Sequence, residues 1–147
     1  MVPADGSNIY KEPPIGVRKD GSSYTALIVD DSRTIREMLK HILMSVKIKI
    51  LDEADNGEVA IMKIKNQNMN PDFIFIDMDM PVMNGIDTVK KLRPVLPDTR
   101  IIMVTSHGEK EVVMQILQIG VNEYVKKPFD RDTVIAKIRS VLKTPVK

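Results

Sequence analysis

The sequence has no cysteine, few aromatic residues (4%) and no long apolar run. Without cysteine the chain can form neither a disulfide nor a cysteine-ligated metal site, which fits a reducing compartment. Because no stretch of about 18 apolar residues exists and the N-terminus lacks an apolar signal core, nothing predicts a membrane span or secretion. We therefore expect a cytoplasmic protein.

No single stretch of the chain is rich in charges of one sign. The net charge is +2 over 147 residues, with neither a basic block nor interleaved aromatic residues, so we predict no nucleic-acid partner and no membrane partner. The hydrophobic content of 43% is enough for one packed core, and the length predicts one domain. We expect that domain to be a monomer.

The first 22 residues differ in composition from the rest of the chain. They contain three prolines and three glycines and show neither helical nor strand periodicity. This composition predicts a flexible N-terminal extension over residues 1–22, followed by one domain over residues 23–147. A docking arm or a dimer clasp is the alternative for the extension.

From Tyr24 onward, short apolar runs alternate five times with amphipathic helical patterns. Such alternation predicts an α/β fold in which parallel strands are joined by right-handed crossovers, with helices on both faces of the sheet. The third helix carries Pro94, which predicts a bend or an early end. The predicted strands are 26–29, 48–54, 73–76, 100–105 and 122–126, and the last two helices are predicted at 110–118 and 131–142.

Polar side chains stand where four of these strands end. Asp30 and Asp31 follow the first strand, Asp77 follows the third, Thr105 ends the fourth and Lys127 follows the fifth. Since the carboxyl ends of parallel strands share one edge of the sheet, we expect these five residues to converge.

The expected cluster has a definite chemistry. Crowded carboxylates repel one another unless one of them takes up a proton or a cation compensates them, and oxygen ligands suit Mg²⁺. An aspartate beside Mg²⁺ and a lysine can attack phosphorus, because both cations offset the charge of a transferring phosphoryl group. We therefore predict that Asp77 becomes an aspartyl phosphate.

Five sequence motifs carry a resemblance to a known family. They are LIVDDS at 27–32, EADNG at 53–57, IDMDMPVMNG at 76–85, MVTS at 103–106 and EYVKKPF at 123–129. In this order, most of them at predicted strand ends, they resemble the receiver domains of two-component response regulators. The resemblance implies a (βα)5 fold of the flavodoxin/CheY-like type with strand order 2-1-3-4-5. Single-domain, CheY-like chemotaxis regulators look closest.

The resemblance also implies roles for the residues at the phosphoryl site. Asp77 would accept the phosphoryl group from the phosphohistidine of a histidine kinase. The protein would itself catalyse this transfer to Asp77 and the later hydrolysis of the phosphoryl group. Asp31, Asp77 and the backbone carbonyl of Asp79 would bind Mg²⁺ directly, and Asp30 would act through water. Lys127 would pair with the phosphate.

Further positions would serve switching and rate control. Thr105 would hydrogen-bond a phosphate oxygen, and Tyr124 would swing inward behind it. Asp79 and His107 occupy positions that tune the dephosphorylation rate in the family. The implied partners are a chemotaxis-type histidine kinase, a flagellar switch protein and an aspartyl-phosphate phosphatase.

Three other functions compete with this interpretation. A haloacid-dehalogenase-like phosphatase would use Asp77 and Asp79, but that family places its nucleophile before its metal-binding acid pair. A flavodoxin-like cofactor carrier needs a phosphate loop after its first strand, where this chain has DDSRT. A receiver of a phosphorelay or a stress pathway remains open beside the chemotaxis function.

Overall fold

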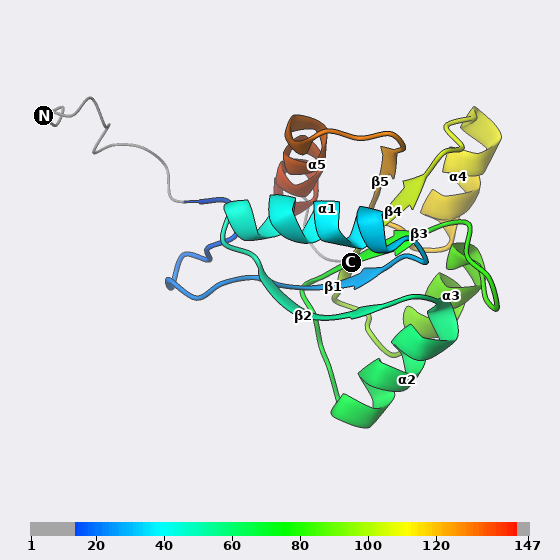
Figure 1. Cartoon of the computed structure of the whole chain (residues 1–147), viewed down its shortest axis with the longest axis horizontal. Coiled ribbons are helices and arrows are strands. Elements are labelled where there is room, and N and C mark those ends of the chain that lie inside the picture. The colour runs from blue at the N-terminus through cyan, green and yellow to red at the C-terminus, as the bar shows by residue number, and fades with distance from the viewer. Residues whose placement is uncertain (1–13, 144–147) are drawn as a thin grey trace, which may run out of the picture.

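The computed structural model describes residues 14–143, and within them five strands alternate with five helices. The strands form one parallel sheet in the order β2-β1-β3-β4-β5 (Figure 1), which confirms the predicted fold. The elements are β1 (Thr25–Val29), α1 (Arg33–Ser45), β2 (Lys49–Ala54), α2 (Gly57–Gln67), β3 (Phe73–Asp77), α3 (Gly85–Leu92), β4 (Arg100–Thr105), α4 (Lys110–Gln118), β5 (Glu123–Lys126) and α5 (Arg131–Lys143).

The sheet separates two apolar cores because successive side chains of a strand point to opposite faces. One core joins the sheet to α1 and α5, and the other joins it to α2, α3 and α4 (Figure 1). Strand β3 is buried at all five positions, as its continuous apolar run predicts. The buried sheet thus holds the carboxyl ends of its strands in fixed positions.

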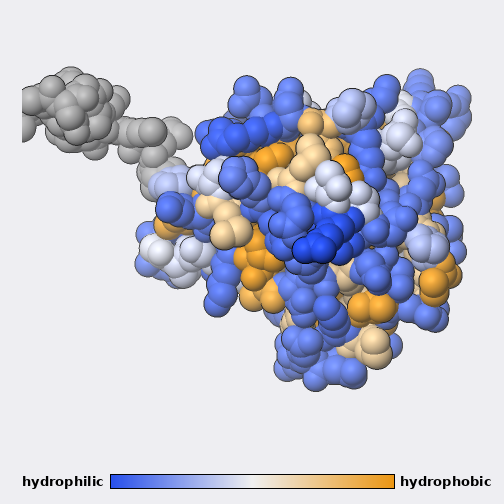
Figure 2. All heavy atoms as spheres, in the orientation of Figure 1, coloured by the Kyte–Doolittle hydropathy of each residue, from blue (hydrophilic) through white to orange (hydrophobic). Residues whose placement is uncertain are grey.

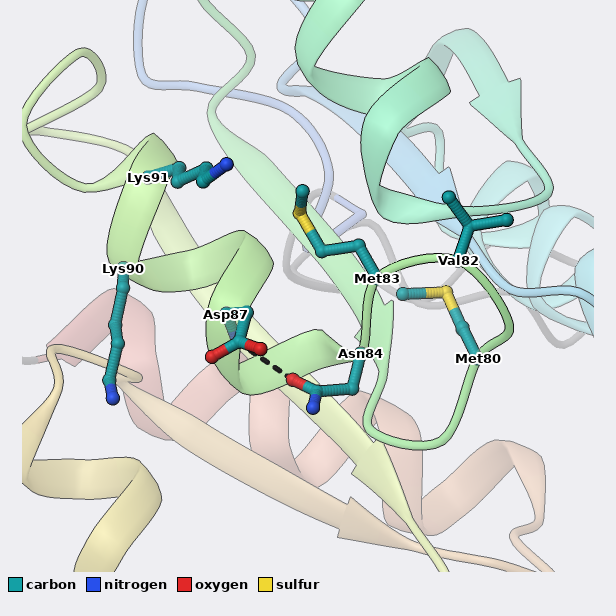
Figure 3. Close-up of a pocket in the computed structure, with 7 residues that line it drawn as sticks. All are labelled: Met80, Val82, Met83, Asn84, Asp87, Lys90 and Lys91. Atoms are coloured by element: carbon teal, nitrogen blue, oxygen red, sulfur yellow. Dashed lines mark hydrogen bonds between the residues drawn. The ribbon is translucent and has the colours of Figure 1, made fainter.

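Polar caps start three helices soon after the strands end. The Ser32 hydroxyl accepts a hydrogen bond from the Ile35 N–H (3.3 Å), and Asn56 and Asn84 cap α2 and α3 in the same way. Figure 3 shows Asn84 beside Asp87, whose N–H it accepts at 2.8 Å. Helix α3 ends at Leu92, two residues before Pro94, so the predicted early end is confirmed.

The N-terminal segment differs from the expectation over part of its length. Residues 1–13, where most of the predicted flexible extension falls, and residues 144–147 lie outside the described part. Residues 14–23, however, turn back on the domain, and Val17 forms an antiparallel bridge with Ser23. The Gly16 N–H donates to the Val46 carbonyl (2.8 Å), and a Cβ on Gly16 would lie only 2.3 Å from that oxygen. The chain therefore joins the domain before the predicted boundary at residue 22.

The surface of the domain is largely polar. Figure 2 shows hydrophilic residues over most of one face, with smaller apolar patches between them. Among residues 14–143 no helix has both the length and the apolar character needed to cross a bilayer.

Candidate functional site

The site lies at the edge of the sheet where the strands end, and backbone hydrogen bonds hold these ends together. The Met78 N–H, just after β3, donates to Val104 of β4 (3.0 Å), and the Lys127 N–H donates to Thr105 (2.8 Å). On the other side of β3, the Asp30 N–H donates to Ala54 at the end of β2 (3.0 Å). The parallel sheet therefore fixes the backbone from which each side chain of the site extends.

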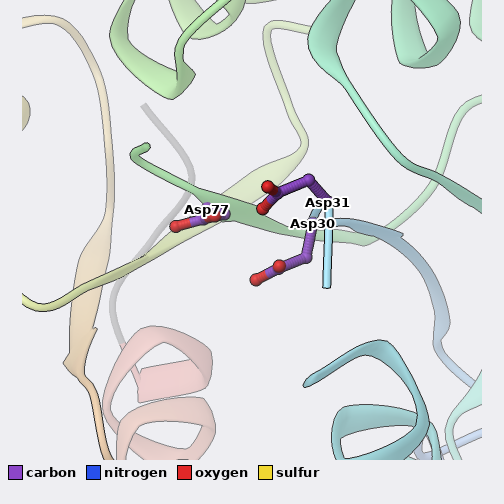
Figure 4. Close-up of side chains that lie close together, drawn as sticks. All are labelled: Asp30, Asp31 and Asp77. Atoms are coloured by element: carbon purple, nitrogen blue, oxygen red, sulfur yellow. The ribbon is translucent and has the colours of Figure 1, made fainter. Parts of the chain in front are cut away.

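Three carboxylates meet at this edge. Asp30, Asp31 and Asp77 each offer an oxygen that lies within 4.8 Å of the oxygens of the other two (Figure 4). Asp30 and Asp77 are 1% and 4% exposed, whereas Asp31 is exposed. Acidic oxygen ligands at this spacing, with one open side, fit a hard divalent cation such as Mg²⁺.

Lys127 is the cation that compensates the two buried carboxylates. Its Nζ lies 3.2 Å from Asp30 Oδ2 and 3.1 Å from Asp77 Oδ1. The other Asp30 oxygen, Oδ1, accepts the Ser32 N–H at 2.8 Å, and Asp77 Oδ1 also accepts the Asp79 N–H at 3.2 Å. Within residues 14–143, Asp77 Oδ2 and the Asp31 carboxylate accept no such hydrogen bond, so these oxygens are available to a ligand.

The electrostatics of Asp77 reflect this crowding. Burial and the negative charge of Asp30 raise the pKa of Asp77 to about 6, although Lys127 and the Asp79 N–H act in the opposite direction. Burial acts to lower the pKa of Lys127, but the charges of Asp30 and Asp77 outweigh it and raise that pKa. At neutral pH, Asp77 is therefore mostly ionised beside a charged lysine.

Thr105 is fully buried at the end of β4, with its hydroxyl held from two sides. It donates to Met78 Sδ (3.5 Å) and accepts the His107 N–H (2.9 Å). The His107 ring in turn lies 3.1 Å from Asp79 Oδ2, at an exposed position. The structure thus places Asp79 and His107 together at the rim beside Thr105 and Asp77.

Tyr124 lies on the same face of the sheet as Thr105. Tyr124 pairs in register with Met103, two residues before Thr105, and its half-buried ring packs against the core that contains α4. Lys137 of α5 reaches around the edge strand and places its Nζ 4.6 Å from the centre of this ring. Lys137 also pairs with Glu123 (3.3 Å), which accepts the Tyr124 N–H (3.0 Å).

Two residues that support the site were missed by sequence reasoning. Arg36 donates from Nη1 to the Asp30 carbonyl (2.8 Å) and from Nε to Glu53 (2.7 Å), so it fixes the backbone of a site carboxylate. Lys137 is the second. Arg36 and its partner Glu53 are 17 residues apart, and Lys137 lies 13 residues after Tyr124, so no local pattern could have identified either contact.

Comparison with known proteins identifies the family. Residues 26–139 match the response regulator receiver domain. The chain belongs to this family. The chemotaxis protein CheY of Treponema pallidum is 31% identical over 95% of this chain and 96% of its own length. CheY1 of Helicobacter pylori (strain ATCC 700392 / 26695) is 38% identical over 80% of this chain and 96% of its own length.

A solved receiver shares the fold closely. A chain of the CheX-CheY-BeF3-Mg²⁺ complex from Borrelia burgdorferi, solved as a crystal structure, superposes with a TM-score of 0.85 at 33% identity, over 89% of this chain and 98% of that one. This chain is therefore a CheY-type receiver, a phosphoacceptor signalling domain, and its acidic cluster fits Mg²⁺ binding. Family membership decides against the dehalogenase-like phosphatase and the flavodoxin-like carrier.

Proposed function

We propose that Asp77 accepts a phosphoryl group from the phosphohistidine of a histidine kinase. The observation that carries this proposal is the position of Asp77: it is 4% exposed, adjoins two further carboxylates and touches the Lys127 ammonium through Oδ1 only. Its Oδ2 is then the attacking atom. An aspartate with compensated charge and one open oxygen is suited to nucleophilic attack on phosphorus.

In the transfer step, a bond forms between Asp77 Oδ2 and phosphorus while the bond from phosphorus to the imidazole nitrogen of the kinase breaks. The leaving imidazole keeps the bonding electron pair and takes a proton from solvent. As negative charge moves from the Asp77 carboxylate to the phosphoryl oxygens, the Lys127 ammonium pairs with these oxygens instead. Asp31, Asp77 and the Asp79 carbonyl, with Asp30 acting through water, would hold Mg²⁺, which would supply positive charge to the transferring group.

The phosphorylated state then changes the surface formed by α4, β5 and α5. Thr105 exchanges its contact with Met78 for a phosphate oxygen, and Tyr124 moves inward along the face that the two residues share. This is a shift between two states, and about 5.5 kcal/mol of differential stabilisation is needed to move the balance from 1:99 to 99:1.

Asp79 and His107 tune the lifetime of the phosphoryl group in this proposal. Their side chains form an exposed pair (3.1 Å) at the rim, where water and a phosphatase approach Asp77. The negative charge of Asp79 alters the approach of both. We expect Asp79→Asn to change the dephosphorylation rate severalfold in a phosphate-release assay, and equal rates would refute this role.

The partners follow from the relatives. Relatives named chemotaxis protein CheY favour a chemotaxis-type kinase, a flagellar switch protein as the target, and an aspartyl-phosphate phosphatase. The alternative is a phosphorelay or a stress pathway. Capture of a flagellar switch component by the phosphorylated chain, but not by the unphosphorylated chain, supports chemotaxis, and capture of another phosphotransfer protein instead supports the alternative.

Acetyl phosphate labelling tests the phosphoacceptor itself. With Mg²⁺, the intact protein should gain the mass of one phosphoryl group, and chelation of Mg²⁺ should prevent the gain. Asp77→Asn should remove labelling, whereas Asp98→Asn, a matched change at an exposed position of the α3–β4 loop, should leave it intact. Labelling of Asp77→Asn at the wild-type level would end the proposal.

A further inference from the structure

The loop between β3 and α3 contains a strained turn at Val82. Its φ is +71°, and the Met83 N–H donates to the Pro81 carbonyl (2.7 Å), which closes a three-residue turn around Val82. This is a γ-turn of the rare, strained kind. Because a β-branched side chain strongly disfavours positive φ, valine is an unfavourable residue for this position.

Burial does not repay this strain. Val82 is 73% exposed, more than any other large apolar residue in the described part of the chain. The loop around it is firmly held nonetheless: the Gly85 N–H donates to the Met78 carbonyl (2.8 Å), and a Cβ on Gly85 would lie 2.4 Å from the Asp77 carbonyl oxygen. The loop that follows Asp77 therefore holds an apolar side chain out into solvent, and strain kept in this way indicates a function.

A cleft of about 500 Å³ adjoins Val82 (Figure 3). Its side on the loop is apolar, and its side on α3 is charged, with two lysines and one aspartate. Both lysines are exposed, and within residues 14–143 neither has a carboxylate at ion-pair distance. The lining residues are Met80, Val82, Met83, Asn84, Asp87, Lys90 and Lys91.

We propose that this surface, formed by Met80, Val82, Met83, Lys90 and Lys91 and called the Val82 surface below, docks the protein that delivers the phosphoryl group to Asp77. The donor places an apolar residue against Val82 and acidic residues opposite the two lysines. Methionine side chains adapt to the shape of a partner, and unpaired lysines attract an acidic surface.

The position of the loop selects this occupant. The loop that carries Val82 begins directly after Asp77 and is bonded back to Met78, so a protein that brings its phosphohistidine to Asp77 Oδ2 approaches this loop. A small phosphodonor reaches Asp77 without touching the Val82 surface. This inference rests on the proposed phosphoacceptor function, and comparison of the two donor types separates the inference from that function.

The test compares two phosphodonors on the full chain. The protein donor is the phosphohistidine-carrying domain of a chemotaxis-type kinase from the same organism, and the small donor is acetyl phosphate, both with Mg²⁺. We expect Val82→Asn to lower kcat/KM for the protein donor about tenfold while acetyl phosphate labelling stays within twofold of wild type. Because asparagine tolerates positive φ, the Tm of this variant should not fall.

Two matched variants test whether the effect depends on the apolar side chain and on its position. Val82→Ile keeps the β-branched apolar side chain and should retain donor transfer. Val95→Asn makes the same polar change at a valine that is 49% exposed beyond the other end of α3, and it should leave both reactions unchanged.

The lysines are tested through ionic strength. The double variant Lys90→Gln/Lys91→Gln should slow transfer from the protein donor at low salt. At 0.5 M salt, the transfer rates of the variant and of wild type should differ less, because screening weakens the interactions of exposed charges. A gap that does not depend on salt would overturn the role of the two lysines.

Other outcomes overturn the inference in distinguishable ways. Unchanged donor transfer by Val82→Asn removes the docking role and leaves the phosphoacceptor function intact. An equal loss with both donors places the effect inside the site and also overturns docking. A concentration-dependent dimer that Val82→Asn abolishes would make a second copy of the chain the occupant. Absence of labelling of the wild type by acetyl phosphate would remove both proposals.

Discussion

One aspartate precedes strand β3 and another is its last residue, and the two have opposite environments. Asp72, just before the strand, pairs with Arg18, and its Oδ2 accepts hydrogen bonds from the Thr25 N–H (2.8 Å) and the Thr25 hydroxyl (3.0 Å). Asp77, five residues later, lies among like charges, and burial and Asp30 raise its pKa to about 6. At one end of the strand an arginine pairs with a single carboxylate, whereas at the other end one lysine is shared by two carboxylates that adjoin a third.

The two environments suit different roles. A carboxylate that is fully hydrogen-bonded and paired stabilises the domain and has little tendency to react. A carboxylate crowded by others lowers the stability of the metal-free protein, but a cation or a phosphoryl group can relieve that crowding. The amino end of the sheet therefore serves stability, and the carboxyl end serves chemistry.

Removal of the cation at each end should give the largest contrast. We expect Lys127→Met to lower the acetyl phosphate labelling rate by about 10²–10³-fold, because the transferring group loses a charge partner. Arg18→Met should leave the rate within twofold and lower the free energy of unfolding by about 1–2 kcal/mol, since it removes the partner of Asp72 and the contact with the Tyr24 ring. Labelling by mass spectrometry and urea unfolding measure the two effects.

The contrast would break if Arg18→Met slowed labelling as strongly as Lys127→Met. The matched control is Lys49→Met, an exposed lysine on the edge strand β2, which should change neither quantity.

The pH dependence of stability should also distinguish the two ends. A carboxyl group whose pKa is raised on folding stabilises the fold below its unfolded pKa of 3.8, and this contribution is lost as the pH rises through about 6. We therefore expect metal-free wild type to lose about 2 kcal/mol relative to Asp77→Asn between pH 4 and pH 7, measured by urea unfolding.

Mg²⁺ should change the stability of the two proteins to different extents. At pH 7 the ion should raise the Tm of wild type more than that of Asp77→Asn, because it binds the folded acidic cluster. Parallel stability curves for the two proteins across the pH range would contradict the unsatisfied state of Asp77.

A smaller effect is expected at Tyr124. The Lys137 ammonium lies 4.6 Å from the centre of the ring, where it would favour the present orientation of the tyrosine and oppose the proposed inward movement. Since such a contact is worth about 0.5–1 kcal/mol, Lys137→Met should lower the beryllofluoride concentration for half-maximal conversion by about 2–5-fold. The ¹⁹F NMR signal of a fluorotyrosine at position 124 reports the conversion.

Lys137→Arg keeps the cation and is the matched control for this contact. It should behave as wild type, and equal behaviour of the two variants would show that the charge over the ring has no effect on the switch.

Much of the fold could be predicted from local sequence. The apolar run before Asp77 fixed a buried strand, helical periodicity fixed the helices, and Pro94 fixed the early end of α3, because each signal spans only a few residues. Residues 14–22 were expected to be flexible because they lack periodicity. They are held by backbone bonds such as Gly16 to Val46, which leave no pattern in a sequence.

Local sequence signals were enough to predict the order of elements and the residue types at the strand ends, since backbone preferences and apolar patterns act over short distances. Tertiary structure alone decided that Lys127 would touch both Asp30 and Asp77, that Lys137 would lie over Tyr124, and that Val82 would be strained and exposed. These contacts join residues far apart in the chain or depend on how a loop closes. Their geometry is fixed only when the sheet brings its strand ends to one edge.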